Sequence, residues 1–442
     1  MKKIIDVIRN APVWVGAILI IIASIFFFLT IPYQYELIET KEAKKVYYVD
    51  GISDAHQEII DKFNVLYKDE IEVIPVNLPF SEFTTNDKKS ILTRSLRNRS
   101  DGIDIFAVDL IWISRFSKWS HPLENDIDSN IISKFNDIAI EACYQNENLL
   151  AFPLFLDMGV LYYRKDLINE LPDGAEIESK LKKSITWKEF IELGKRFNNS
   201  GNPFYIFPGG DFEGMICNYH EMLSKDQSDK IFLENPFNLH TDYSSRALQQ
   251  MVDFIYKYKF TPTNVTDYDD FTAYINGYEK NAVFQRGWIG FPKHFKEYLK
   301  DTTKIKNMHL APLPHFEGNK TSSVFGGWSL MISKFSERKE EALKFILFLF
   351  EKENQIILYE KGGYLPVNTD VYSDSLFMAK NEELKTLIEI IPWAKHRPFI
   401  ENYTRLSKIM SKQFHKALRS EITVSEALDK VNEKINFDKE LK

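Results

Sequence analysis

The stretch IDIFAVDLIWI, residues 103–113, decides the fold class of this chain. It begins with an apolar run that predicts a buried strand, and the carboxylate of Asp109 follows that run directly. Two strand-like runs precede it, KVYYV at 45–49 and IEVIPV at 71–76, and helical patterns separate the three runs. Strands that alternate with helices over short connections indicate a parallel sheet, and therefore an α/β fold. Ligands bind beyond the carboxyl ends of such strands, where Asp109 is expected to lie.

The composition excludes several classes of protein. The chain has 442 residues, of which 44% are hydrophobic and 27% charged, so it is neither a disordered nor a polytopic membrane protein. This length predicts two or three domains. The formal net charge is −7, with 56 basic and 63 acidic residues. An acidic chain lacks the cationic face that a general nucleic-acid binder needs, so no nucleic-acid partner is expected.

The sequence shows no catalytic or metal-binding signature. The patterns GxxxxGK[ST], GxSxG and HExxH are absent, and the nine histidines lack metal-ligand spacing, so neither a metal nor a cofactor is expected. Cys143 and Cys217 cannot form a disulfide framework or a thiolate zinc site. One disulfide between them stays open, although two buried thiols are the simpler interpretation. Carboxylates are abundant, so their number alone does not exclude a paired-carboxylate glycosidase.

The N-terminal region predicts a membrane anchor. Residues 1–12 carry more basic than acidic side chains, and residues 13–31 contain no charge. Such a run is about 30 Å long as a helix, which matches the hydrocarbon core of a bilayer. We therefore expect a cytoplasmic segment (1–12), a transmembrane signal-anchor (13–31), a stalk (32–44) and an extracytoplasmic remainder. A cleaved signal peptide, the alternative, would have a shorter apolar run and small residues at its cleavage site.

Aromatic residues and isolated charges gather in turns, many of them rich in glycine. The set comprises Asp109 with Trp112, Phe155 with Asp157, Arg286-Gly287-Trp288, Gly326-Gly327-Trp328, Gly362-Gly363-Tyr364 and His396-Arg397-Pro398. A sugar site needs this mixture, because flat rings cover the C–H faces of a pyranose while charged groups fix its hydroxyls. Taken singly, Trp288 and Trp328 fit core positions equally well, and Asp157 fits a buried structural carboxylate. Only as a set do these residues favour a ligand cleft.

Nine stretches carry a family resemblance. They are IDIFAVDLIWISRFSKWSHPLE, AFPLFLDMGVLYYRKDLI, ITWKEFIELGKRF, FEGMICNYHEML, INGYEKNAVFQRGWIGF, APLPHFEG, VFGGWSLMISKFSERKEEALKFILFLF, GGYLPVN and HRPFIENYTRLSKIMSKQFHKAL. In this order they resemble bacterial extracellular solute-binding proteins (family 1, sugar type) of ATP-binding-cassette (ABC) importers, and most closely trehalose/maltose-binding proteins. Two features depart from the family. A transmembrane run replaces the lipidated cysteine, and GISDAH after Asp50 lacks an acidic contact that is common in that loop.

The resemblance implies a two-lobed periplasmic-binding-protein-like fold with hinged lobes, preceded here by one transmembrane helix. Residues 45–152 and 313–360 would form the N-terminal lobe and 153–312 the C-terminal lobe, with a helical segment, 361–442, packing on both. The expected function is non-enzymatic: a monomer captures a di- or oligosaccharide between its lobes and delivers it to the permease subunits of an ABC importer. The expected ligand-binding residues are Asp109, Trp112, Phe155, Asp157, Trp288, Gly327, Trp328, Arg397 and Arg94.

Two other functions stay open on the sequence. An extracytoplasmic carbohydrate-active hydrolase would use Asp109 and Asp157 as acid and base. A sensor on the same scaffold would pass its closed state to a partner protein instead of passing cargo to a permease. The sequence does not identify the sugar, and the same scaffold also carries other polar solutes.

Overall fold

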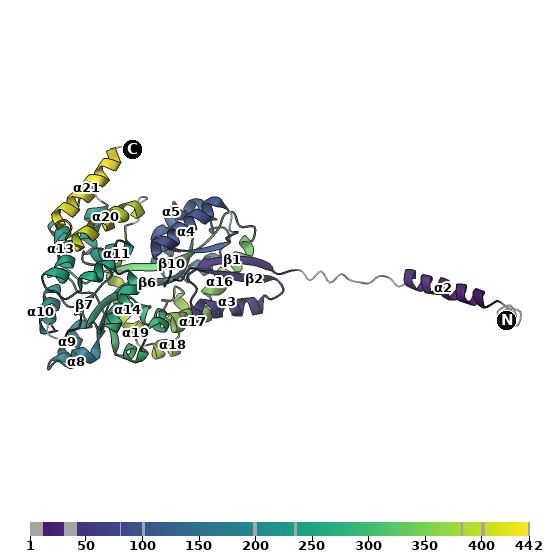
Figure 1. The fold of residues 1–442 in the computed structure, drawn as a ribbon, viewed down its shortest axis with the longest axis horizontal. Coiled ribbons are helices and arrows are strands. Elements are labelled where there is room, and N and C mark those ends of the chain that lie inside the picture. The colour runs from purple at the N-terminus through teal and green to yellow at the C-terminus, as the bar shows by residue number, and fades with distance from the viewer. Residues whose placement is uncertain are drawn as a thin grey trace. The chain divides into compact units, whose positions relative to one another are not determined.

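The computed structural model describes most of the chain, namely residues 12–30, 42–79, 81–99, 102–197, 201–233, 237–381, 383–398 and 403–440. It divides into two compact units, residues 1–43 and 44–442 (Figure 1). The first unit contains one described helix, α2 (Val13–Thr30), whose side chains at Trp14, Ile20 and Phe26 are exposed. Within the described residues, no helix combines the length and apolar character needed to cross a membrane. Ile31, the last residue of the expected span, lies outside the described residues. So do nearly all residues of the predicted cytoplasmic segment and stalk.

The second unit begins with the parallel sheet that the sequence predicts. Strand β1 (Lys44–Asp50) pairs in parallel with β2 (Ile71–Asn77) and with β3 (Ile105–Asp109). Two helices connect them, α3 (Asp54–Leu66) and α4 (Thr85–Asn98). Both begin at capping boxes, in which a hydroxyl residue satisfies a free amide of the first turn. The carboxyl end of β3 therefore carries Asp109, as predicted from the strand pattern.

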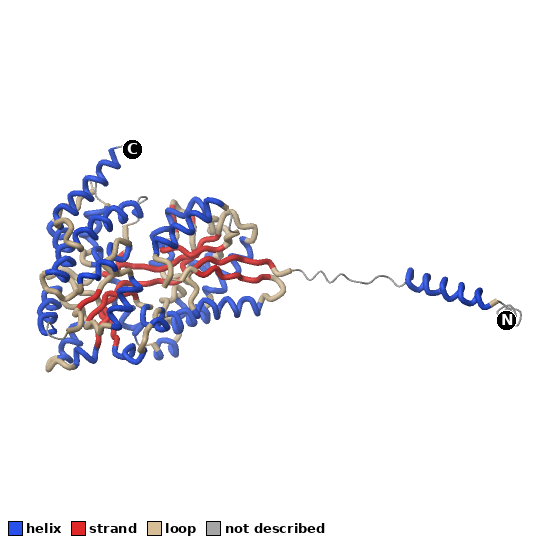
Figure 2. Tube along the Cα trace, in the orientation of Figure 1, coloured by secondary structure: helices blue, strands red, loops and turns tan. Residues whose placement is uncertain are grey.

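Two long strands continue this sheet across the whole unit. Strand β6 (Phe152–Arg164) pairs in antiparallel fashion with β10 (Ser323–Ile332), and β10 also pairs with β3. The far half of β6 pairs with β8 (Phe284–Trp288) and β9 (Met308–Ala311), and β7 (Tyr205–Ile206) lies beside β8. The resulting strand order is β2-β1-β3-β10-β6-β8-β7. Figure 2 shows the strands of the unit in red and the helices around them in blue. Both crossing strands thus run through the middle of the unit.

The remaining elements cover this sheet or connect its strands. They are α5 (Ile113–Phe116), α6 (Ser129–Ile132), α7 (Asp137–Glu141), β4 (Tyr144–Gln145), β5 (Asn148–Leu149), α8 (Lys165–Asn169), α9 (Gly174–Leu181), α10 (Trp187–Phe197), α11 (Glu213–Glu221), α12 (Lys225–Phe232), α13 (Asp242–Tyr256), α14 (Asp270–Glu279), α15 (Phe291–His294), α16 (Lys339–Phe350), α17 (Lys352–Gly362), α18 (Ser375–Lys380), α19 (Glu383–Ile390), β11 (Ala394–Lys395), α20 (Tyr403–Leu418) and α21 (Val424–Glu440). Seven 3₁₀ turns complete the described elements, among them η1 (Leu110–Trp112).

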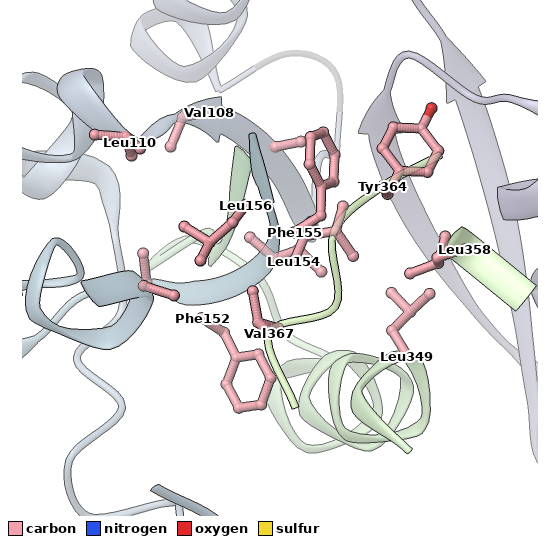
Figure 3. Close-up of a cluster of buried hydrophobic side chains, with 14 of the residues drawn as sticks. Val108, Leu110, Phe152, Leu154, Phe155, Leu156, Leu349, Leu358, Tyr364 and Val367 are labelled. Carbon is pink, nitrogen blue, oxygen red and sulfur yellow. The ribbon is translucent and has the colours of Figure 1, made fainter. Parts of the chain in front are cut away.

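The apolar side chains form two separate clusters, which define two lobes. The first cluster gathers side chains of β1, β3, α3, α4, α16, α17 and the start of β6, and we call this part the N-terminal lobe. Figure 3 shows its centre, where Phe152, Leu154 and Leu156 of β6 lie among residues of β3 and of α16–α17. The second cluster gathers side chains of α10, α11, α13, α20 and α21, and we call it the C-terminal lobe. The molecule is therefore a two-lobed α/β protein.

Strand β6 supplies both clusters. Val160 and Tyr162 belong to the first cluster, whereas Leu161 and Tyr163 belong to the second. Successive side chains of a strand point to opposite faces, which explains the alternation. The segment 361–442 also reaches both clusters, since residues of α19 join the first and residues of α20 the second. The predicted lobe limits at residues 152 and 312 stay predictions.

Candidate functional site

A cavity lies between the two lobes, where β3 ends and where β6 and β10 cross. The space between its lining atoms measures about 890 Å³, part of which is open to solvent. It is lined by Phe83, Thr84, Thr85, Asp109, Phe155, Asp157, Phe212, Glu213, Gly214, Cys217, Asp269, Asp270, Phe271, Trp288, Phe291, His294, Phe295, Gly326, Gly327, Trp328 and Arg397. Seven of the nine residues predicted from the sequence are in this set. The structure thus brings together side chains that are far apart in the sequence.

Two of the predicted residues, Trp112 and Arg94, do not line the cavity. Trp112 is 2% exposed, because the 3₁₀ turn η1 directs its ring into the core. There it packs edge-on against the ring of Trp328, with the ring centroids 5.8 Å apart. Arg94 lies on the exposed side of α4, whose buried side is formed by Lys88, Leu92 and Leu96 at helical spacing. Trp112 therefore supports the cavity from behind, and Arg94 faces away from it.

Gly327, the second glycine of the Gly326-Gly327 pair, shapes the cavity where β6 and β10 cross. In the β10–β6 ladder, Gly327 lies opposite Leu156, and the register shifts directly after Trp328. Gly327 has φ +139°, and a Cβ at this position would lie 2.5 Å from the carbonyl oxygen of Phe155. Glycine is therefore needed here for its backbone conformation and for the close approach of the two strands. This geometry places Trp328 and Phe155 beside each other on the cavity wall.

The ring of Trp288 is fixed by a polar network beneath it. Its indole nitrogen donates a hydrogen bond to Asp270 Oδ1 (3.1 Å), and the guanidinium of Arg286 lies 4.1 Å from the ring centroid. Arg286 is itself buried and donates two hydrogen bonds to Glu221, of 2.6 and 3.0 Å. Gly159 leaves the room for this pair, since a Cβ there would lie 1.9 Å from a carboxylate oxygen of Glu221. Trp288 is only partly buried and lines the cavity.

Two carboxyl groups of the cavity have strongly perturbed acidity. Asp157 accepts hydrogen bonds from the backbone amides of Met158 (2.8 Å) and Ile289 (3.0 Å). Burial raises the pKa of Asp157 to about 7, although these two amides favour the ionised form. Burial likewise raises the pKa of Asp270 to about 6, against the attraction of Arg286. Near neutral pH each group can therefore accept a hydrogen bond when ionised or donate one when protonated.

An arginine connects the two lobes at the cavity. Arg397 is 2% exposed and donates hydrogen bonds to both oxygens of Asp109, at 2.6 and 3.3 Å. It also donates to Glu213 Oε1 (3.1 Å), at the first residue of α11. Glu213 accepts two further hydrogen bonds, from the hydroxyls of Tyr403 and Ser407 in α20. Each oxygen of both carboxylates thus has a donor, and Arg397 is shared between them.

Several lining residues were missed in the sequence because their pattern has an ordinary structural meaning. Thr84 and Asp269 are N-caps of α4 and α14, and Glu213 is an acidic residue in the first turn of α11. Such residues occur at helix starts with or without a ligand site. The lining phenylalanines other than Phe155, and His294, lie in stretches without any local signal of a ligand site. Burial lowers the pKa of His294 to about 3, so this ring is neutral at physiological pH.

The cavity is suited to binding a polar molecule that also has apolar faces. Aromatic rings form much of its wall, and carboxylates and one guanidinium supply the polar contacts. Among the described residues, no group of three or more His, Cys, Asp or Glu side chains is arranged to hold a metal ion. Both cysteines are free and buried, so the disulfide that the sequence left open is not formed.

Comparison with known proteins identifies the family. Residues 51–356 match the family described as "Bacterial extracellular solute-binding protein". A Deinococcus radiodurans protein named "Probable ABC transporter-binding protein" is 24% identical over 352 residues, which cover 76% of this chain and 79% of the relative.

Two solved structures of similar fold are sugar complexes. Maltose-bound MalE3 of T. maritima is 27% identical with a TM-score of 0.78, covering 89% of this chain and all 100% of MalE3. An ABC transporter solute-binding protein of Thermotoga lettingae, bound with α-D-tagatose, is 20% identical with a TM-score of 0.74 and covers 89% and 99% of the two chains. The latter likeness concerns the fold alone. Since the family match extends over most of the chain, this protein belongs to the bacterial extracellular solute-binding proteins.

Proposed function

We propose that this chain is a membrane-anchored, extracytoplasmic binding protein that captures a di- or oligosaccharide and delivers it to an ABC importer. The observation that carries the proposal is the composition of the cavity between the lobes. Trp288, Trp328 and Phe155 offer rings to it, and Asp157 and Arg397 offer charged groups. The similarity to maltose-bound MalE3 supports a sugar as the ligand.

The chemistry of the cavity matches the two surfaces of a sugar ring. The C–H faces of a pyranose are apolar and pack against flat aromatic faces. Such packing stabilises a complex by more than the burial of apolar area alone. The hydroxyls at the ring edge need charged or polar partners, and hydrogen bonds to charged groups contribute about 1.5–3 kcal/mol each. Asp157 is well placed for this role, because only backbone amides bind its carboxylate among the described residues.

Capture would occur by closure of the lobes. The lining residues come from the end of β3 and the start of α4 on one side and from the start of α11 on the other. A ligand that contacts both sides binds more tightly to the closed form, and this difference in affinity drives closure. The closed form is then the one that an importer's permease subunits recognise.

Anchoring and location follow from the sequence. The uncharged run from 13 to 31 would hold the protein, as a monomer, on the outer face of the cytoplasmic membrane, with the binding unit outside. High-salt washing should then leave the protein in the membrane fraction, with its N-terminus intact. Recovery of a soluble mature form that starts near residues 32–45 would overturn the anchor but leave sugar capture untouched.

Calorimetric titration of the full-length protein in detergent micelles tests the sugar. Maltose, trehalose, maltotriose and tagatose would be titrated in turn, and each sample would then be analysed for sugar breakdown. We expect saturable binding of at least one sugar and its recovery intact. Release of shorter sugars would instead favour the hydrolase that the sequence left open. If none of the four sugars binds, the proposal that the ligand is a sugar of this kind is overturned.

A further inference from the structure

The segment that carries Arg397 is fastened to the C-terminal lobe at both ends. Before it, β11 pairs with the first residues of β10, and Lys395 Nζ donates hydrogen bonds to the backbone carbonyls of Leu223 (2.5 Å) and Ser224 (3.3 Å). These carbonyls lie just beyond α11. After the segment, α20 packs its apolar side beyond Tyr403 into the second cluster. Arg397 therefore moves with the C-terminal lobe.

Glu213 determines where the guanidinium of Arg397 points. Its carboxylate accepts hydrogen bonds from Arg397, Tyr403 and Ser407, so it connects the start of α11 to the start of α20 and to Arg397. The Glu213 side chain is 16% exposed and that of Arg397 is 2% exposed. A planar guanidinium whose Nη1 donates to a fixed carboxylate has few orientations available to it.

The same guanidinium reaches across to the N-terminal lobe through Nη2 and through Nη1, the nitrogen that also donates to Glu213. There it pairs with both oxygens of Asp109 at the end of β3. Lys89 on α4, in the N-terminal lobe, is a second cation, and it is attracted to both Glu213 and Asp109. The charges on the two sides of the cavity are thus complementary without any bound molecule.

We propose that Glu213 is a positioning residue that holds Arg397 against Asp109, so that the three side chains keep the lobes together before a ligand enters. The inference deepens the proposed function, on which it rests for the view that the lobes separate to admit a ligand. It gives Glu213 a role in closure that acts through Arg397, whether or not Glu213 touches the ligand.

Energy transfer between two labels tests this without any sugar. The full-length protein, in detergent micelles, would carry dyes at Asn98→Cys on α4 and Lys412→Cys on α20, two exposed positions of opposite lobes. The native cysteines are buried and do not compete for the dyes. Glu213→Gln keeps the size of the side chain but removes its charge. Glu192→Gln, at an exposed glutamate of α10, is the matched control.

We expect Glu213→Gln to lower the ratio of closed to open molecules by about tenfold, since a charge-assisted hydrogen bond is lost. Asp109→Asn should have a similar effect. The double variant should be little more open than the more open single variant, because both changes break the same chain of contacts. The control should match the wild type.

Additive effects of the two substitutions would overturn the inference, and so would a Glu213→Gln protein that is as closed as the control. A wild-type protein that is fully open without sugar would overturn it as well. Because no sugar is present, the outcome is separate from that of the sugar titrations. Coupled opening in a protein that binds none of the sugars would leave this inference standing and the proposed ligand class wrong.

Discussion

Trp328 lies directly opposite Asp109 in the antiparallel ladder of β10 and β3, and opposite Phe155 in the ladder of β10 and β6. One residue of the central strand therefore sets the positions of two neighbours on the cavity wall. Any change that displaces β10 by a fraction of an ångström would move an aromatic face relative to a charged group. The precision of this site depends on the sheet more than on any loop.

The two tryptophans should be needed for binding more than for folding. Trp288→Ala and Trp328→Ala should each abolish sugar binding, because each removes a ring face from the cavity. Truncating a fully buried tryptophan costs about 3–5 kcal/mol, and both rings are only partly buried, so the loss of stability should be smaller. Titration calorimetry and melting curves of each variant measure the two effects. Trp393→Ala, at a 39% exposed ring outside the cavity, is the control. Retained binding with lost stability would assign these rings to the core.

Asp157 should make the ligand-free protein less stable as the pH rises. Its pKa is about 7 in the folded protein, against an ordinary value of 3.8, so the folded state holds the proton more tightly than the unfolded state does. The stabilisation is complete below pH 3.8 and is lost as the pH rises to about 7. Asp157→Asn should therefore reduce the fall in unfolding free energy between pH 5 and pH 8 by about 1 kcal/mol or more.

Denaturant melts at several pH values measure this slope. The matched control is Asp370→Asn, at a carboxylate that is 47% exposed. Equal slopes in wild type and Asp157→Asn would show that Asp157 titrates normally. At pH 8, where Asp157 is mostly ionised, sugar affinity should fall by about tenfold in Asp157→Asn, because a charge-assisted acceptor is replaced by a neutral one.

The strand crossing should not tolerate a side chain at Gly327. Gly327→Ala introduces both a strained φ and a Cβ that lies 2.5 Å from a carbonyl oxygen. Gly318→Ala separates the two effects, since Gly318 has φ +84° but open space around the Cβ. We expect a loss of about 1 kcal/mol in Gly318→Ala, from strain alone. Gly327→Ala should lose at least twice as much in urea unfolding and should also lose sugar binding. Equal losses would mean that β6 and β10 separate easily.

The buried pair beneath Trp288 should be costly to break. Among the described residues, Glu221→Gln leaves Asp270, 3.7 Å from Arg286 Nη1, as the carboxylate partner of this guanidinium. Removing one partner of a buried pair typically costs about 3–5 kcal/mol. The exposed pair of Lys195 and Glu192 should matter by less than about 1 kcal/mol. Chemical denaturation compares the two, and tryptophan fluorescence of Glu221→Gln should show that Trp288 has moved. Equal small losses would contradict the support that we assign to Arg286.

The sequence predicted local features of this protein well and contacts between distant segments poorly. The three strands of residues 45–108 were visible because buried parallel strands are apolar runs between helices. Asp109 was visible because a carboxylate follows an apolar strand directly, and the cavity residues of β6 because an isolated charge accompanies an aromatic residue. Those of β8 and β10 were visible because glycine lies beside an aromatic residue. Glu213 was not visible, since its meaning depends on Arg397, which is 184 residues away. In the sequence, Trp112 and Trp328 both looked like candidates for the cavity wall. The turn η1 after β3 directs Trp112 into the core instead, and nothing in the sequence indicated this turn.

The alternation along β6 has a consequence for how the protein unfolds. Neighbouring residues of β6 belong to different hydrophobic clusters. Unfolding of either lobe would therefore remove part of the strand that the other lobe's core needs. The two lobes should therefore unfold cooperatively, and the extracytoplasmic unit should melt in a single transition. A fragment that contains only one lobe would retain β6, but the apolar side chains of β6 that pack into the missing lobe would be exposed. The strand that crosses between the lobes therefore prevents them from existing as independent domains.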